Sequence, residues 1–171
     1  MKTTMILLLA SSLLGFAFMI TFNIIGNYQY ERDYQSYWNL ADKASTIEQK
    51  AEYIDKYVNA IENGSMSGYN AIIFTTPDNS FEQNLIALKS LQVRLHKISK
   101  MDINSFEYQT AISQITQQEQ GKAYKMIMIF QGIWWKCHYF LLWNWIGETM
   151  IGLFIIMLLI SSVLAYIYYG P

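Results

Sequence analysis

The sequence predicts an all-α membrane protein in which two transmembrane helices flank a bundle of long helices. Two uncharged apolar segments, one near each end of the 171-residue chain, predict the transmembrane helices. Between them, apolar residues repeat with a heptad-like spacing that predicts a three-helix, coiled-coil-like bundle. Hydrophobic residues make up 53% of the chain and charged residues only 15%, well below the roughly 25% typical of soluble domains.

Residues 4–26 and 149–169 contain no charged side chain. Each segment is close to the roughly 20 residues that a helix needs to cross the hydrocarbon core. Because no small-residue cleavage site follows the first segment, we expect an uncleaved signal anchor rather than a removed signal peptide. The chain then divides into an N-terminal transmembrane anchor (1–27), a helical bundle domain outside the bilayer (28–138), and an aromatic interface with a C-terminal transmembrane helix (139–171).

A single helix over residues 28–62 is predicted as the first element of the bundle. No proline or glycine interrupts this segment, and Asn63-Gly64 is typical of a helix C-terminus. Its apolar residues alternate in steps of four and three, as in a helix that packs along one seam. The seam consists of Leu40, Ala44, Ile47, Ala51, Ile54, Val58 and Ile61.

Residues 63–80, which we call the strap, are predicted to be extended because β-branched and aromatic residues precede Pro77. Ser80, with Gln83 three residues later, predicts the start of a second helix at 81–101. Three strictly antiparallel helices would leave residue 138 far from the bilayer. We therefore predict that the strap runs back towards the membrane, so that the first two helices both point away and the third returns. A break at Gly121, giving four shorter helices, is the alternative.

The number of spans depends on residues 124–146, which are apolar enough to form a third span. A third span would place Lys136 near the bilayer centre, where a lysine costs about 3 kcal/mol. On a helix Trp143 and Tyr166 would be about 34 Å apart, close to the separation of the two interfacial belts. We predict two spans, with Glu148 at the mouth of the second. In the three-span alternative, Lys136 and Glu148 are candidate intramembrane polar groups.

No pattern predicts catalysis, a cofactor or a metal ion. Cys137-His138 supplies too few ligands for zinc and lacks the C-x-x-C-H spacing of haem attachment. The chain has neither a G-x-S-x-G motif nor a glycine-rich phosphate loop. Twelve basic and thirteen acidic residues give a net charge of −1 without a basic block, so nucleic acid is not an expected partner.

Aromatic residues are the clearest candidates for contacts with a partner. They surround the predicted base of the bundle, and two more lie in the strap. We expect a structural, scaffolding or partner-docking role, with the lipid bilayer and either a second copy or another membrane protein as partners. The candidate interface residues are Tyr34, Trp38, Tyr69, Phe74, Trp134, Trp135 and Trp143.

The sequence is also compatible with two other arrangements of spans and bundle, each of which implies a different function. Two anchors around an exported bundle resemble the ligand-binding half of chemoreceptors, which implies a sensor without its output domain. A helical hairpin between one span and a later pair resembles guided-entry receptors and Oxa1-like insertases, which implies three spans and a cytosolic hairpin. Lys2 favours a cytoplasmic N-terminus, so we expect an integral protein of the cell membrane whose bundle is extracytoplasmic.

Overall fold

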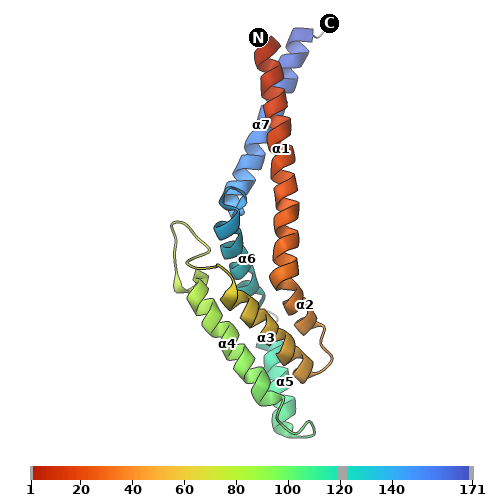
Figure 1. Ribbon diagram of the computed structural model, residues 1–171, viewed down its shortest axis with the longest axis vertical. Coiled ribbons are helices and arrows are strands. Elements are labelled where there is room, and N and C mark those ends of the chain that lie inside the picture. Colours follow the sequence, from red (N-terminus) through yellow and green to blue (C-terminus); the bar gives the residue numbers. More distant parts are fainter. Residues whose placement is uncertain (1, 119–122, 170–171) are drawn as a thin grey trace.

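The computed structural model describes residues 2–118 and 123–169, which form a long, narrow molecule (Figure 1). Every regular element in this part of the chain is helical. Two long helices, α1 and α7, lie side by side at one end, and the first and last described residues lie at that same end. In chain order the elements are α1 (Lys2–Tyr30), a π-helical turn (Glu31–Gln35), α2 (Ser36–Asp42), α3 (Ile47–Asn63), a 3-10 turn (Pro77–Asn79), α4 (Phe81–Ile98), α5 (Phe106–Gln118), α6 (Tyr124–His138), a 3-10 turn (Phe140–Leu142) and α7 (Asn144–Tyr169).

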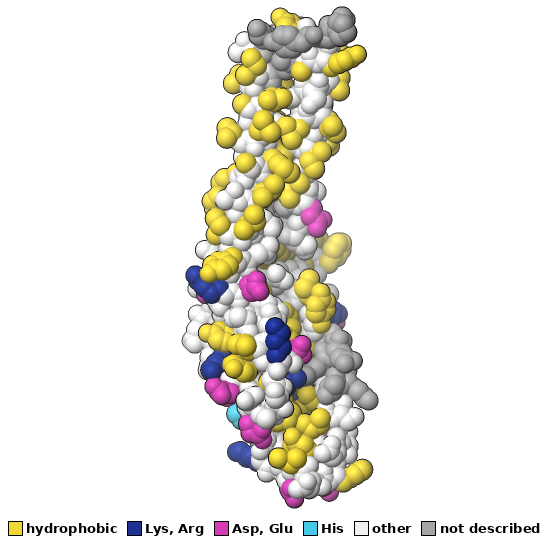
Figure 2. All heavy atoms as spheres, turned by 90° about the vertical axis from the view of Figure 1, so that its right-hand side faces the viewer, with side chains coloured by type: hydrophobic (Ala, Val, Ile, Leu, Met, Phe, Trp, Pro, Cys, Tyr) yellow, Lys and Arg dark blue, Asp and Glu magenta, His cyan; other side chains and the backbone are white. Residues whose placement is uncertain are grey.

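Helices α1 and α7 are the two elements, within the described ranges, that are long and apolar enough to cross a membrane. Figure 2 shows this half of the molecule covered by apolar side chains on the face in view. Small residues allow the two helices to pack closely, since a Cβ added at Gly15 would lie 2.3 Å from the Phe154 ring. The hydroxyls of the buried Ser12 and Ser161 donate to carbonyls of their own helices, so neither leaves an unpaired polar group.

The predicted continuous helix over 28–62 is wrong, because the chain reverses direction at residues 43–46. The helix that begins as α1 continues through the π-helical turn into α2 and ends at Asp42, and α3 then packs against α2. Thr46 caps the new helix, since its Oγ1 accepts a hydrogen bond from the Gln49 amide at 3.2 Å. A side-chain cap satisfies an amide that has no partner within the helix, so this reversal needs neither proline nor glycine.

The reversal also changes the path of the strap. Helix α3 runs towards α1 and α7, the two candidate spans, α4 runs away from them, and α5 and α6 return (Figure 1). The strap therefore joins two helix ends on the same side of the bundle and does not run back along it, which corrects the predicted extended return. Its ends are held together by hydrogen bonds from Asn70 N to Asn79 O and from Phe81 N to Gly68 O, both 2.8 Å.

The last predicted helix of the bundle is described as two helices, α5 and α6. The alternative break at Gly121 lies outside the described residues. With α2 and α3 separated as well, the region 28–138 contains more helices than the three that were predicted.

The bundle has one core, formed by facing sides of α3, α4 and α6. Of the predicted seam residues in α3, Ala51, Ile54, Val58 and Ile61 are buried, whereas Ile47 is half-buried. In α4 the buried apolar residues include Leu88, Leu91, Leu95 and Ile98. The seam prediction was wrong before α3, where Leu40 is exposed and Ala41 is buried instead. Ser80 caps α4 as predicted, accepting a hydrogen bond from the Gln83 amide at 3.3 Å.

Polar contacts also tie α3 to α4. The Asp55 carboxylate accepts a hydrogen bond from Gln92 Nε2 at 2.7 Å, and His96 Nε2 lies 2.9 Å from the same oxygen. Lys89 forms an ion pair with Glu62. These groups lie near the surface, so they add little to stability and serve mainly to fix the register of the two helices.

Candidate functional site

The bundle meets α1 and α7, the two candidate spans, in a cluster of aromatic side chains, which we call the aromatic junction. The rings of Tyr30 and Trp134 are 5.5 Å apart between centroids, and those of Trp134 and Trp135 are 5.6 Å apart. The Tyr139 hydroxyl donates to Gln29 Oε1 at 2.7 Å, which links the end of α6 to α1. The junction contains Tyr30, Tyr34, Trp38, Tyr57, Phe130, Trp134, Trp135 and Tyr139.

Most of the predicted interface aromatics lie inside the molecule. Trp134, Trp135 and Trp143 are buried. Tyr34 stacks on Tyr30 and Trp38 packs edge-on against Tyr57, so both are half-buried. These five side chains leave little surface for a partner, since they fill the space between the bundle and the spans.

Two phenols at the centre of the junction were not predicted. The hydroxyls of Tyr30 and Tyr57 are shielded from solvent, and neither has a hydrogen-bond partner of ordinary geometry among the described residues. Burial, with Tyr30 close by, raises the pKa of the Tyr57 phenol well above its ordinary value. A phenol in this setting stays neutral at physiological pH, which suits a packing role better than proton transfer.

Lys136 attaches the strap to the end of α6. Its Nζ donates to the carbonyl oxygens of Tyr69 and Ala71, both at 2.8 Å, and lies 5.2 Å from the centre of the Trp143 ring. The Trp143 indole in turn donates to Asn70 Oδ1 at 3.3 Å. Lys136 therefore has protein partners, and the described part of α6, at 15 residues, is too short to span a bilayer.

Large apolar side chains are exposed at the level of this attachment. In the strap they are Ile72, Ile73 and Phe74, and Tyr69 is partly exposed beside them. At the joint between α6 and α7, Phe140 and Leu141 are exposed as well. Of the predicted interface residues, Tyr69 and Phe74 are therefore the most exposed.

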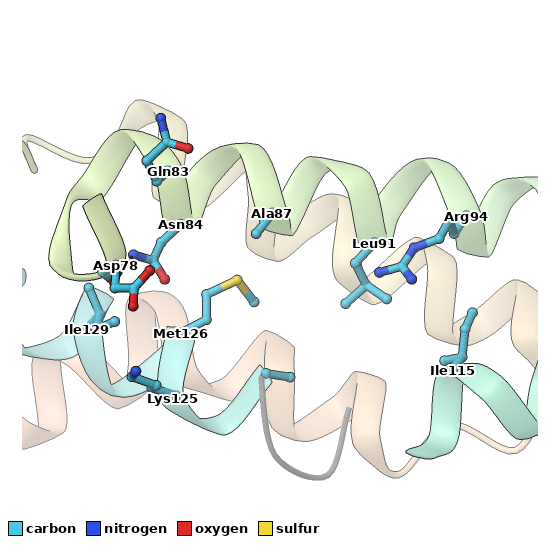
Figure 3. Close-up of a pocket in the computed structure, with 11 residues that line it drawn as sticks. Asp78, Gln83, Asn84, Ala87, Leu91, Arg94, Ile115, Lys125, Met126 and Ile129 are labelled. Carbon is cyan, nitrogen blue, oxygen red and sulfur yellow. Dashed lines mark hydrogen bonds between the residues drawn. The ribbon is translucent and has the colours of Figure 1, made fainter. Parts of the chain in front are cut away.

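A groove of about 490 Å³ lies between α4 and the two helices α5 and α6. In Figure 3, Leu91 and Met126 point into it from opposite sides. Charged side chains stand at its edge, from Asp78, Arg94 and Lys125. No sequence pattern indicates this groove, because its lining comes from three helices whose relative positions depend on the tertiary fold.

A smaller cleft of about 220 Å³ lies where α1 and α7 diverge. Glu148 lines it, together with Asn23, Asn27 and Asn144. Asn27 Nδ2 donates to Asn23 Oδ1 at 2.9 Å. Glu148 itself is exposed, and it lies within the first turns of α7 rather than midway along it.

The cysteine and the two histidines do not come together at one site, because Cys137 and His138 lie at the end of α6 and His96 lies on α4. Cys137 is exposed, and His138 stacks on Trp134 with its Nδ1 2.9 Å from the Trp134 carbonyl oxygen. His96 lies on α4, beside Asp55. Within the described ranges, no three of the histidine, cysteine and acidic residues are placed to hold one metal ion.

No family model matches this chain, and no curated protein or solved structure matches it either. Inference about its function therefore depends on its own residues.

Proposed function

We propose that this chain is an integral membrane protein without catalytic activity, whose bundle docks a segment of another membrane protein in the groove between α4 and α6. Helices α1 and α7 serve as its two spans. The aromatic junction holds the bundle in a fixed orientation above them. The groove is the observation that carries the docking role.

The lining of the groove favours an apolar segment as the occupant. Leu91, Met126 and Ile129 offer apolar surface. The charged side chains among the described residues that line the groove are Asp78, Arg94 and Lys125. An amphipathic helix that presents apolar side chains and an acidic residue would complement this surface. A membrane protein is the proposed partner because a bundle carried on two spans is held close to the bilayer.

Several predictions from the sequence belong to this proposal. The first span acts as an uncleaved signal anchor. The first and last described residues lie at the same end of the molecule in Figure 1, so a cytoplasmic start of α1 implies a cytoplasmic end of α7 and an extracytoplasmic bundle. Coiled-coil packing of the seams is likewise a prediction.

Photocrosslinking in native membranes tests the docking role. A benzoylphenylalanine at Ala87, which lines the groove, should give one discrete product with a second protein, and the same label at Lys125 should give the same product. Val93 is the matched control, because it lies on the same helix, is well exposed and does not line the groove. Its label should give no such product.

Equal yields at Ala87 and Val93, or adducts with lipid alone, would contradict the docking role. A product of twice the mass of the chain would identify a second copy as the occupant in place of another protein.

Ligand sensing is a second candidate, favoured by the volume of the groove, which falls in the range of roughly 300–1,000 Å³ typical of small-molecule sites. A small molecule that binds there should protect a cysteine at Ala87 from thiol reagents. Dialysis of the membranes should remove a small molecule. A protein partner should still be crosslinked when the label is activated after extensive dialysis.

A further inference from the structure

The tip of the strap exposes large apolar side chains within an uncharged segment. Residues 63–77 contain no charged side chain. Phe74 is 83% exposed, and Ile73 beside it is 76% exposed. Exposure of consecutive large apolar side chains to water is unfavourable in free energy. Such a surface indicates a contact with a membrane or another molecule.

The strap is held at a defined height relative to the spans. Lys136 binds its carbonyls at residues 69 and 71, and Trp143 binds the Asn70 side chain. Trp143 immediately precedes α7, which begins at Asn144. Figure 1 shows the strap rising past the adjacent ends of α3 and α4 to the level where α7 begins.

The contact between α6 and the strap is also close. A Cβ added at Gly132 would lie 2.2 Å from Asn70 Oδ1, so glycine allows the strap to approach the helix. At the same level Phe140, Leu141 and Trp145 are exposed. These residues lie just before α7 or in its first turn, so apolar side chains are exposed at this end of the helix as well.

We propose that the tip of the strap, Ile72-Ile73-Phe74, inserts into the lipid bilayer beside α7. The inference rests on the proposal that α1 and α7 span the membrane. Lys136 and Trp143 hold the base of the strap, and the apolar tip lies among the lipid headgroups and the adjoining acyl carbons, level with the first turn of α7. The bundle is thereby held against the membrane at a third point, away from the axis of the two spans.

Fluorescence quenching in lipid vesicles tests this insertion with the full chain. In a Cys137→Ser background, an NBD fluorophore is attached to Phe74→Cys, Phe106→Cys or Leu159→Cys. The vesicles contain phosphatidylcholine with a nitroxide near the headgroup or near the end of the acyl chain. We expect NBD at position 74 to emit at shorter wavelength and to be quenched several-fold more by the shallow nitroxide than NBD at position 106.

The controls separate the possible failures. Phe106 is 81% exposed, nearly as much as Phe74, but it lies at the start of α5, far from the spans (Figure 1). Leu159 is an exposed residue of α7 and should be quenched whatever the strap does. If position 159 is quenched and position 74 is not, the insertion is wrong although the spans are right. If position 159 is not quenched, the membrane placement itself is wrong.

A further variant tests the attachment. Lys136→Met removes both hydrogen bonds to the strap, and quenching at position 74 by the shallow nitroxide should fall towards the value at position 106. Emission at shorter wavelength without quenching by either nitroxide would overturn the proposal, because it would place the tip against protein.

Discussion

Replacing Phe130 by alanine should lower the free energy of unfolding by about 3–5 kcal/mol, the usual range for removal of a large buried aromatic side chain. Phe130 is fully buried. Its ring packs edge-on against Tyr57 of α3, at 6.4 Å between centroids, and against Phe81 of α4, at 5.7 Å. The substitution therefore opens a cavity where three helices meet. Urea unfolding in detergent micelles, followed by circular dichroism, measures the loss.

Met128→Ala is the control, because Met128 lies two residues earlier on α6 and is exposed. It should change the free energy of unfolding by less than about 0.5 kcal/mol. If both variants lost stability equally, α6 would not pack on α3 and α4 through the face described above.

Replacing Trp143 by alanine should have an effect of similar size, about 3–5 kcal/mol, and should also release the strap. Trp143 is 1% exposed. The Lys136 ammonium lies 5.2 Å from the centre of its ring, and its indole N–H donates a hydrogen bond to Asn70 Oδ1. Loss of the indole removes a hydrogen bond and a cation–π contact as well as buried apolar area. Unfolding in micelles reports the stability, and limited proteolysis between residues 63 and 80 reports the release.

Trp145→Ala provides the matched comparison, since Trp145 lies two residues further on and is half exposed. Its removal should leave the strap resistant to protease. Equal cleavage of the strap in both variants would show that Trp143 does not hold it.

The helical faces that pack within the bundle could be predicted, because they depend on local periodicity. Ile54, Val58 and Ile61 recur at helical spacing and are buried. The reversal at residues 43–46 was missed although Thr46 and Gln49 stand at the spacing of a cap. The apolar seam continued through this turn by chance at Leu40 and Ala44, and so a longer helix was inferred.

The candidate site could be predicted only in part. The meeting of aromatic residues from α1 and α6 followed from their position next to the apolar segments. Their burial did not, because it depends on contacts between distant parts of the sequence: Trp38 packs against Tyr57 of α3, Trp134 against Tyr30 of α1, and Trp143 binds Asn70 of the strap. The hydrogen bonds of Lys136 could not be predicted either, because its acceptors, Tyr69 and Ala71, precede it by more than sixty residues. Sequence alone left Lys136 either at the interface or within a third span.

Cysteine labelling at Met128 and Ser65 tests most directly the claim that two spans carry a bundle held outside the bilayer. Both positions are exposed, one on α6 and one in the strap, and Cys137→Ser removes the native thiol. In intact cells or sealed vesicles, a membrane-impermeant maleimide should label both cysteines from the same side of the membrane. Labelling of position 65 together with protection of position 128 until detergent is added would place α6 in the bilayer and contradict the two-span account.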